Sequence, residues 1–135
     1  MKHIKEFSKF SLLEKSDVSE WVGNIEDVTE DNEMYRMVLF TGSKLQLVLM
    51  SIPAGEEIGE EVHEDGDQFL RFEVGEGQVI IDGRVHNVKE NWAITIPAGT
   101  RHNVINTGEG PLKLYSVYAP PVHASGLIQA ENPNK

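Results

Sequence analysis

A glutamate, a histidine and a glutamine lie at spacings that would let them act together on one ligand. Glu61 and His63 are two residues apart, so in an extended segment their side chains point to the same face. Gln68 shares its phase with Leu70 and Phe72, which places its amide at the end of an inward-facing apolar row. A buried amide beside a carboxylate and an imidazole needs partners, and a cation is one way of satisfying all three.

The segment around these residues is strongly acidic. Seven carboxylates occupy the twelve residues 56–67, with His63 as the one histidine among them. These charges repel one another unless something positive offsets them. Four of the side chains are expected to form a solvated acidic loop, namely Glu56, Glu57, Glu60 and Glu64.

The elements that must position these side chains are short strands. From residue 34 onward, segments of five to eight residues rich in Val, Ile, Leu and aromatics recur between turn signals, a pattern that predicts β-structure. Asp82 and Gly83 stand between two such segments and predict a type I′ hairpin turn, whose two central residues have positive φ. The predicted strands cover residues 34–40, 45–52, 68–74, 78–81, 85–88, 92–96, 102–105 and 112–118.

Eight short strands without a convincing helix between them predict an all-β fold. Such strands cannot form βαβ units, so the sheet must be antiparallel, in a sandwich, a jelly roll or a small barrel. Residues 1–33 are weakly patterned and are interpreted as a short irregular lead-in, and residues 34–122 as the β-barrel domain. Residues 123–135 show no strand pattern and are expected to form a flexible tail that wraps over the surface or frays.

Size and composition indicate one soluble domain. The chain has 135 residues and no cysteine, which excludes disulfides, thiolate metal sites and cysteine nucleophiles. Its net charge of -10 argues against nucleic acid and anionic membrane surfaces as partners. The longest apolar runs have four residues, whereas a membrane span needs about 18. A cytoplasmic location is therefore expected.

The spacing of these residues resembles that of the cupins. The first cupin motif reads G-x5-H-x-H-x4-E-x6-G and the second reads G-x5-P-x-G-x2-H-x3-N. The first falls on Gly55, Glu61, His63, Gln68 and Gly75, and the second on Asn91, Pro97, Gly99, His102 and Asn106. Glu61, Gln68 and Asn91 replace the first histidine, the glutamate and the leading glycine of the family pattern. The segments 55–63, 67–69 and 118–121 resemble small bacterial and archaeal cupins labelled mannose-6-phosphate isomerase-like.

The resemblance implies a jelly-roll β-barrel, also called a double-stranded β-helix, that holds one divalent transition metal ion. Carried over by position, the metal ligands are Glu61, His63, Gln68 and His102. Two imidazoles and one carboxylate suit Fe(II), and Zn(II), Mn(II) and Ni(II) fit equally well. Asp67 would replace Gln68 as a ligand if the strand shifted by one residue. The resemblance also implies a homodimer.

The leading functional hypothesis is a metal-dependent isomerase or lyase acting on a small polar, sugar-like molecule. Fe(II)-dependent dioxygenation and a non-catalytic module that binds a metabolite or a metal are the alternatives. Asp67, Glu61 if it is not a ligand, and His123 are the candidates for a proton-transferring residue. Arg36 shares the phase of inward-facing residues and would meet an anionic substrate there, but such an arginine more often extends to solvent at a strand end. His123 is likewise expected at the surface more than over the barrel mouth.

Overall fold

The computed structural model describes residues 19–134 and confirms an all-β fold. All eight predicted strands are present, with bounds that differ from the prediction by at most two residues. The first eighteen residues of the predicted lead-in lie outside the described part of the chain. In chain order the elements are α2 (Ile25–Asp31), β1 (Arg36–Thr41), β2 (Gln46–Ile52), β3 (Asp67–Val74), β4 (Glu76–Ile81), β5 (Arg84–Lys89), β6 (Ala93–Ile96), β7 (His102–Asn106), β8 (Leu112–Ala119) and β9 (Ile128–Gln129).

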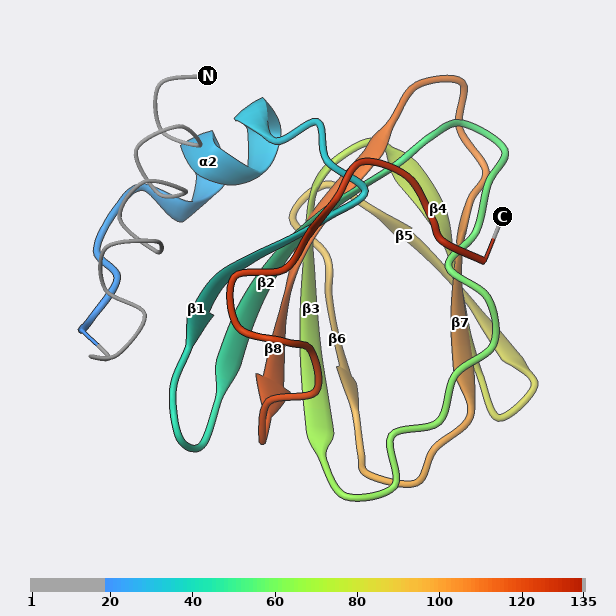
Figure 1. Cartoon of the computed structure of the whole chain (residues 1–135). Coiled ribbons are helices and arrows are strands. Elements are labelled where there is room, and N and C mark those ends of the chain that lie inside the picture. Colours follow the sequence, from blue (N-terminus) through green and yellow to red (C-terminus); the bar gives the residue numbers. More distant parts are fainter. Residues whose placement is uncertain (1–18, 135) are drawn as a thin grey trace.

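The strands form two antiparallel sheets. The larger sheet has the order β6-β3-β8-β2-β1-β9, and the smaller one has the order β5-β4-β7. Figure 1 shows the two sheets facing each other, with the long 53–66 connection running down the side of the smaller sheet. This is the predicted jelly-roll arrangement, a double-stranded β-helix, and its interior lies between the two sheets.

The predicted hairpin between β4 and β5 is confirmed. Asp82 and Gly83 have φ values of 49° and 82°, as a type I′ turn requires. The flanking residues Ile81 and Arg84 pair directly, and the strands continue in register from there.

The core lies between the sheets and is built by alternating residues of both. Leu70 and Phe72 of β3 face the same interior as Val79 of β4 and Val104 of β7, and all four are almost fully buried. Successive side chains of a strand alternate between the two faces of a sheet, so every second residue points into the interior. Some of these inward-pointing residues are polar, and they form the candidate site.

Helix α2 packs on the outer face of the larger sheet (Figure 1), where it contacts β3 and β8 and buries side chains of β1 and β2. Its Val28 packs with Met37, Leu39 and Leu49, which point away from the barrel interior. Asn24 caps the helix by accepting a hydrogen bond from the backbone of the first turn. The segment expected to be irregular therefore contains one short helix.

The C-terminal segment adds a ninth strand that the sequence pattern did not indicate. Ile128–Gln129 forms β9, which pairs with the start of β1. Upstream of β9, the fully buried Gln46 accepts hydrogen bonds from the backbone N–H groups of Val122 and His123 and donates one to the carbonyl of His123. The segment after β8 is thus fastened across one end of the barrel at two places.

Candidate functional site

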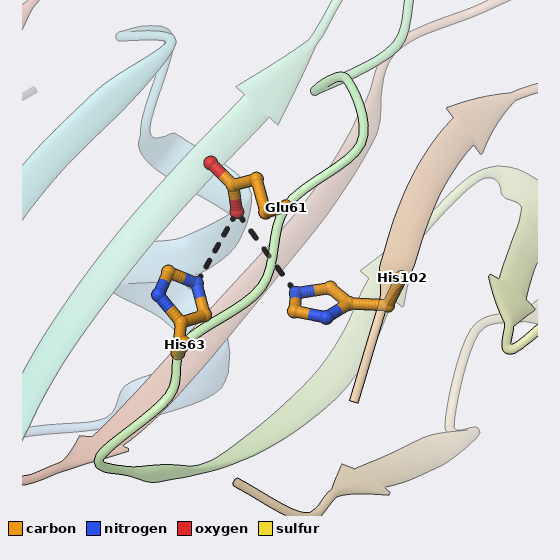
Figure 2. A group of neighbouring side chains, drawn as sticks. All are labelled: Glu61, His63 and His102. Carbon is orange, nitrogen blue, oxygen red and sulfur yellow. Dashed lines mark ion pairs between the residues drawn. The ribbon is translucent and has the colours of Figure 1, made fainter. Parts of the chain in front are cut away.

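Glu61, His63 and His102 bring three ligand atoms together inside the barrel. Glu61 and His63 lie on the connection between β2 and β3, and His102 is the first residue of β7. One Glu61 oxygen lies 3.3 Å from Nε2 of His63 and 3.9 Å from Nε2 of His102, as Figure 2 shows. The three ligand atoms all lie within 4.8 Å of one another. The grouping of Glu61 with His63 from their spacing is confirmed.

The backbone holds Glu61 and His102 side by side. Each donates its N–H to the carbonyl of the other, at 2.8 and 2.9 Å, in an isolated antiparallel bridge. In such a hydrogen-bonded pair the two side chains project from the same face of the sheet. The carboxylate and the imidazole are therefore neighbours because of strand pairing.

A bulge sets the direction of the Glu61 side chain. The same connection makes a second bridge to β7 between Glu57 and Ile105. Between the two bridges the connection advances by four residues and β7 by only three, so the connection contains one extra residue. The extra residue falls near Gly59, which has φ 104° and donates its N–H to the side chain of Asn103. Because one inserted residue reverses the alternation, Ile58 packs on the core while Glu61 also turns inward.

The chain around His63 is tied to the turn that precedes β7. The carbonyl of His63 accepts a hydrogen bond from the N–H of Gly99 at 2.9 Å. The carboxylate of Asp67 accepts one from the N–H of Ala98 at 2.9 Å. These two contacts hold the connection against the 97–100 turn, so both histidines are positioned by one continuous piece of backbone.

The histidine nitrogens that face Glu61 fit a metal ion. Nδ1 of His102 lies 2.9 Å from the carbonyl oxygen of Thr100, which can only accept, so the neutral ring carries its proton on Nδ1 and a lone pair on Nε2. Nε2 of His102 is buried and makes no hydrogen bond, and Nε2 of His63 is buried with only the Glu61 oxygen, at 3.3 Å, as a polar neighbour. Buried polar atoms rarely lack a partner. Two buried imidazole nitrogens whose one polar neighbour is a shared carboxylate are a donor set suited to a divalent transition metal.

The charge state of Glu61 also suits a ligand. Burial works to raise the pKa of this carboxyl, but the neighbouring His63, together with Arg36 and His102, lowers it by more, so the pKa lies below its ordinary value. The side chain is therefore an anion at neutral pH and needs no deprotonation before it binds a cation.

Gln68 and Asp67 are neighbours in β3, and their side chains lie on opposite faces of the sheet. Gln68 is buried on the inner face, where its Nε2 donates to Ser116 at 3.4 Å and its Oε1 has no hydrogen-bond partner. Asp67 is exposed and engaged with Ala98. The one-residue shift that would make Asp67 a ligand is absent, because Gln68 pairs with Ile96 and Asp67 keeps the outer phase. Gln68 as a fourth ligand stays a prediction.

Tyr118 and His123 extend the site toward the end of the barrel. The ring of Tyr118 makes edge contacts with His63 at 5.5 Å and with His123 at 5.2 Å. Burial is the main cause that lowers the pKa of His123 to about 4, with Arg36 adding to it and Glu61 opposing it. Burial likewise raises the pKa of Tyr118, so its hydroxyl stays protonated. The expectation of a surface position for His123 is wrong, because the residue is half-buried and its Nε2 is covered, while Gln46 holds its backbone.

Arg36 is also placed differently from the expectation. It does not extend to solvent at the strand end but is 7% exposed and pairs across the sheet with the buried Met50. Its Nη1 donates to the side-chain oxygen of Gln129 in β9 at 2.6 Å. The phase of β1 is compatible with this inward position, and the contact that keeps the guanidinium inside comes from Gln129, 93 residues away.

The fold, the two motifs and the cluster agree with a comparison to known families, in which a cupin domain model matches residues 48–118. This chain belongs to the cupin family. The match spans the barrel strands from β2 to β8, and so includes Glu61, His63 and His102.

Several proteins are similar to this cupin over most of its length. Uncharacterized protein YrkC of Bacillus subtilis is 47% identical over 123 residues, which cover 87% of this chain and 66% of that protein. Uncharacterized protein L612 of Acanthamoeba polyphaga mimivirus is 39% identical over 118 residues, covering 84% and 73%. The crystal structure of BH2720 from Bacillus halodurans matches with a TM-score of 0.81 and 50% identity, covering 83% of this chain and 89% of that one. The cupin thus spans about two thirds of the length of the Bacillus subtilis protein.

No helix of residues 19–134 is long and apolar enough to cross a membrane.

Proposed function

We propose that this cupin binds one divalent transition metal ion through Glu61, His63 and His102 and acts as an isomerase or lyase on a small polar, sugar-like molecule. The observation that carries the proposal is the convergence of three ligand atoms, two of which are buried nitrogens with no polar neighbour other than the Glu61 carboxylate. Gln68 would supply a carbonyl oxygen as a further ligand. The bound ion would act as a Lewis acid on a carbonyl or hydroxyl oxygen of the substrate.

The side chains beside the cluster supply what proton transfer needs. His123 is unprotonated at neutral pH, so a ring nitrogen can accept a proton, although its pKa of about 4 makes it a weak base. Its Nε2 is buried and has no partner. Tyr118 keeps its proton and can donate a hydrogen bond to a substrate oxygen. Of the three proton-transfer candidates, His123 is favoured, because Asp67 is exposed and Glu61 belongs to the ligand set.

Fe(II)-dependent dioxygenation is the second candidate function. The observation in its favour is the ligand set itself, since two histidines and one carboxylate are the protein ligands of many non-haem Fe(II) oxygenases. The two functions differ in their need for O₂, because isomerisation and elimination consume none.

The test is a turnover assay on protein reconstituted separately with Zn(II), Mn(II), Ni(II) and Fe(II). A panel of aldoses, ketoses and sugar acids is incubated with each form in air and under strict anaerobiosis, and products are identified by NMR. Turnover that survives anaerobiosis and is abolished in His102→Ala supports the isomerase or lyase. Turnover only with Fe(II) and O₂ supports the oxygenase. Binding of panel compounds without turnover in any form would favour the non-catalytic module.

Three further assignments rest on the family resemblance and stay predictions: the mannose-6-phosphate isomerase-like group, the homodimer and the cytoplasmic location. Sedimentation of the purified protein would test the dimer directly.

A further inference from the structure

Arg36 is a buried cation on the same interior face as the metal-ligand cluster. It shares the inward phase of Val38, and both belong to the stretch of β1 that pairs with buried residues of β2. Only 7% of the residue is exposed. Its charge acts on Glu61, Tyr118 and His123, so the guanidinium lies close enough to influence the residues around the cluster.

The guanidinium is only partly satisfied by the protein. Nη1 donates to Gln129, and the neighbouring Tyr35 ring lies beside the group at 5.1 Å. Nε is buried and has no hydrogen-bond partner. Among residues 19–134, no carboxylate oxygen lies within the 4.0 Å of an ion pair with Arg36. Gln129 and the Tyr35 ring are neutral, and Glu61 offsets the charge only from a distance, because it makes no ion pair with Arg36. The guanidinium therefore lacks a direct anionic partner, which proteins seldom leave out around a buried cation.

We propose that Arg36 binds the carboxylate or phosphate group of a small anionic ligand inside the barrel, beside the Glu61, His63 and His102 cluster. The unpartnered Nε belongs to the edge of the guanidinium that binds two oxygens of a planar anion side by side. Gln129 holds the opposite nitrogen and so fixes the orientation of that edge. The inference rests on the proposed function only in placing the rest of the ligand at the metal cluster.

The charges of the site strengthen this inference if the cluster holds a metal. Without a metal, the formal charges of Glu61 and Arg36 sum to zero while the histidines are neutral. A divalent ion changes this sum to +2 within a largely buried site. An anion would then be bound more tightly to the metal-loaded protein than to the metal-free protein, and by linkage it would tighten metal binding by the same factor.

The test is calorimetric titration of the wild type with malonate, pyruvate and inorganic phosphate, first metal-free and then loaded with Zn(II). The matched variants are Arg36→Gln and Arg36→Lys, and Arg84→Gln removes an exposed arginine of the β4-β5 hairpin as a control. We expect at least one probe to bind the wild type and Arg84→Gln equally. Arg36→Gln should weaken this binding about tenfold or more, because charge-assisted hydrogen bonds are lost. Whether malonate or phosphate binds more tightly identifies the anionic group.

The inference is overturned if no probe binds the metal-free wild type at concentrations up to about 10 mM. It is also overturned if Arg36→Gln binds the probes as tightly as the wild type. If Arg36→Gln does not fold, Arg36→Lys decides, since it keeps the charge but loses the two-nitrogen edge, and unchanged binding would overturn the inference. Thermal unfolding gives a separate readout. If the charge of Arg36 serves a ligand and not the fold, Arg36→Gln should have a melting temperature no lower than that of the ligand-free wild type. Failure of the wild type to bind Zn(II) would refute the proposed function, while the metal-free titration still decides the role of Arg36.

Discussion

Glu61 and His102 are joined twice, by two backbone hydrogen bonds and by side chains that face each other inside the barrel. They lie 41 positions apart in the sequence, yet the bridge leaves their relative placement little freedom. His102 is further held by Thr100, and His63 by Gly99. The ligand set is thus built into the rigid part of the fold, as a preorganised metal site requires.

The bulge at Gly59 should be necessary for this placement. Gly59→Ala puts a side chain at φ 104°, a conformation that L residues rarely adopt, so we expect a loss of about 1–3 kcal/mol in the free energy of unfolding. Relief of the strain would displace Glu61, so metal affinity should fall as well. Chemical denaturation and a competitive metal titration measure the two effects.

Gly110→Ala is the matched control, because Gly110 has no positive φ and nothing lies within 4 Å of an added Cβ. If both variants behave alike, the bulge does not position Glu61.

Gln46 should determine the order of the segment that carries His123. Gln46→Ala leaves the two N–H groups of Val122 and His123 and one carbonyl without their partner. We expect a loss of about 2 kcal/mol in stability and faster hydrogen exchange at these two amides. Gln78→Ala removes a partly exposed side chain that bonds to Asn87, and it should leave exchange after β8 unchanged. Equal exchange in the Gln46 variant and the wild type would refute this role.

The lowered pKa of His123 predicts a pH-dependent stability. The imidazole titrates near its ordinary value of 6.5 in the unfolded chain but at about 4 in the folded one. Between these values the unfolded state binds more protons, so stability is fully present above pH 6.5 and falls as the pH drops toward 4. In His123→Asn, the free energy of unfolding should fall by on the order of 2 kcal/mol less over this pH range than in the wild type. Urea unfolding of metal-free protein at several pH values tests it, and identical slopes in variant and wild type would contradict it.

Gln68→Glu restores the carboxylate of the cupin motif at a buried position. Without metal, the new carboxylate is buried, and its loss of hydration should lower stability by about 2 kcal/mol or more. With metal, it adds an anionic ligand and should raise the affinity for Zn(II). Opposite shifts of the melting temperature without and with Zn(II) are therefore expected. A uniform destabilisation would show that Gln68 lies too far from the ion to act as a ligand.

The strands and most of the site could be predicted from the sequence because their signals are local. Asp82 and Gly83 carry their own turn geometry, and Glu61 and His63 are two residues apart on one extended segment. Asn91, which stands in place of the motif glycine, adopts φ 73°, a conformation that asparagine tolerates better than most residues. His102 joined the ligand set only through the family motif, because strand pairing across 41 residues leaves no local pattern.

The features that could not be predicted depend on contacts between distant segments. Arg36 has the same phase whether its guanidinium extends to solvent or stays inside, and Gln129 decides between them from β9. His123 follows two prolines in an unpatterned segment, and only Gln46 reveals its position. Helix α2 has seven residues in an acidic stretch, and its stability comes from the packing of Val28 against the outer face of the sheet.

The most direct test of the metal site is the metal content of the purified protein, measured by mass spectrometry after reconstitution. The wild type is compared with His63→Ala and His102→Ala, and with His86→Ala on β5 as the control. We predict close to one equivalent of a transition metal in the wild type and in His86→Ala, and loss of that metal in the other two variants. No metal above background in the wild type, or full metal content in His102→Ala, would contradict the assignment of Glu61, His63 and His102 as a metal site.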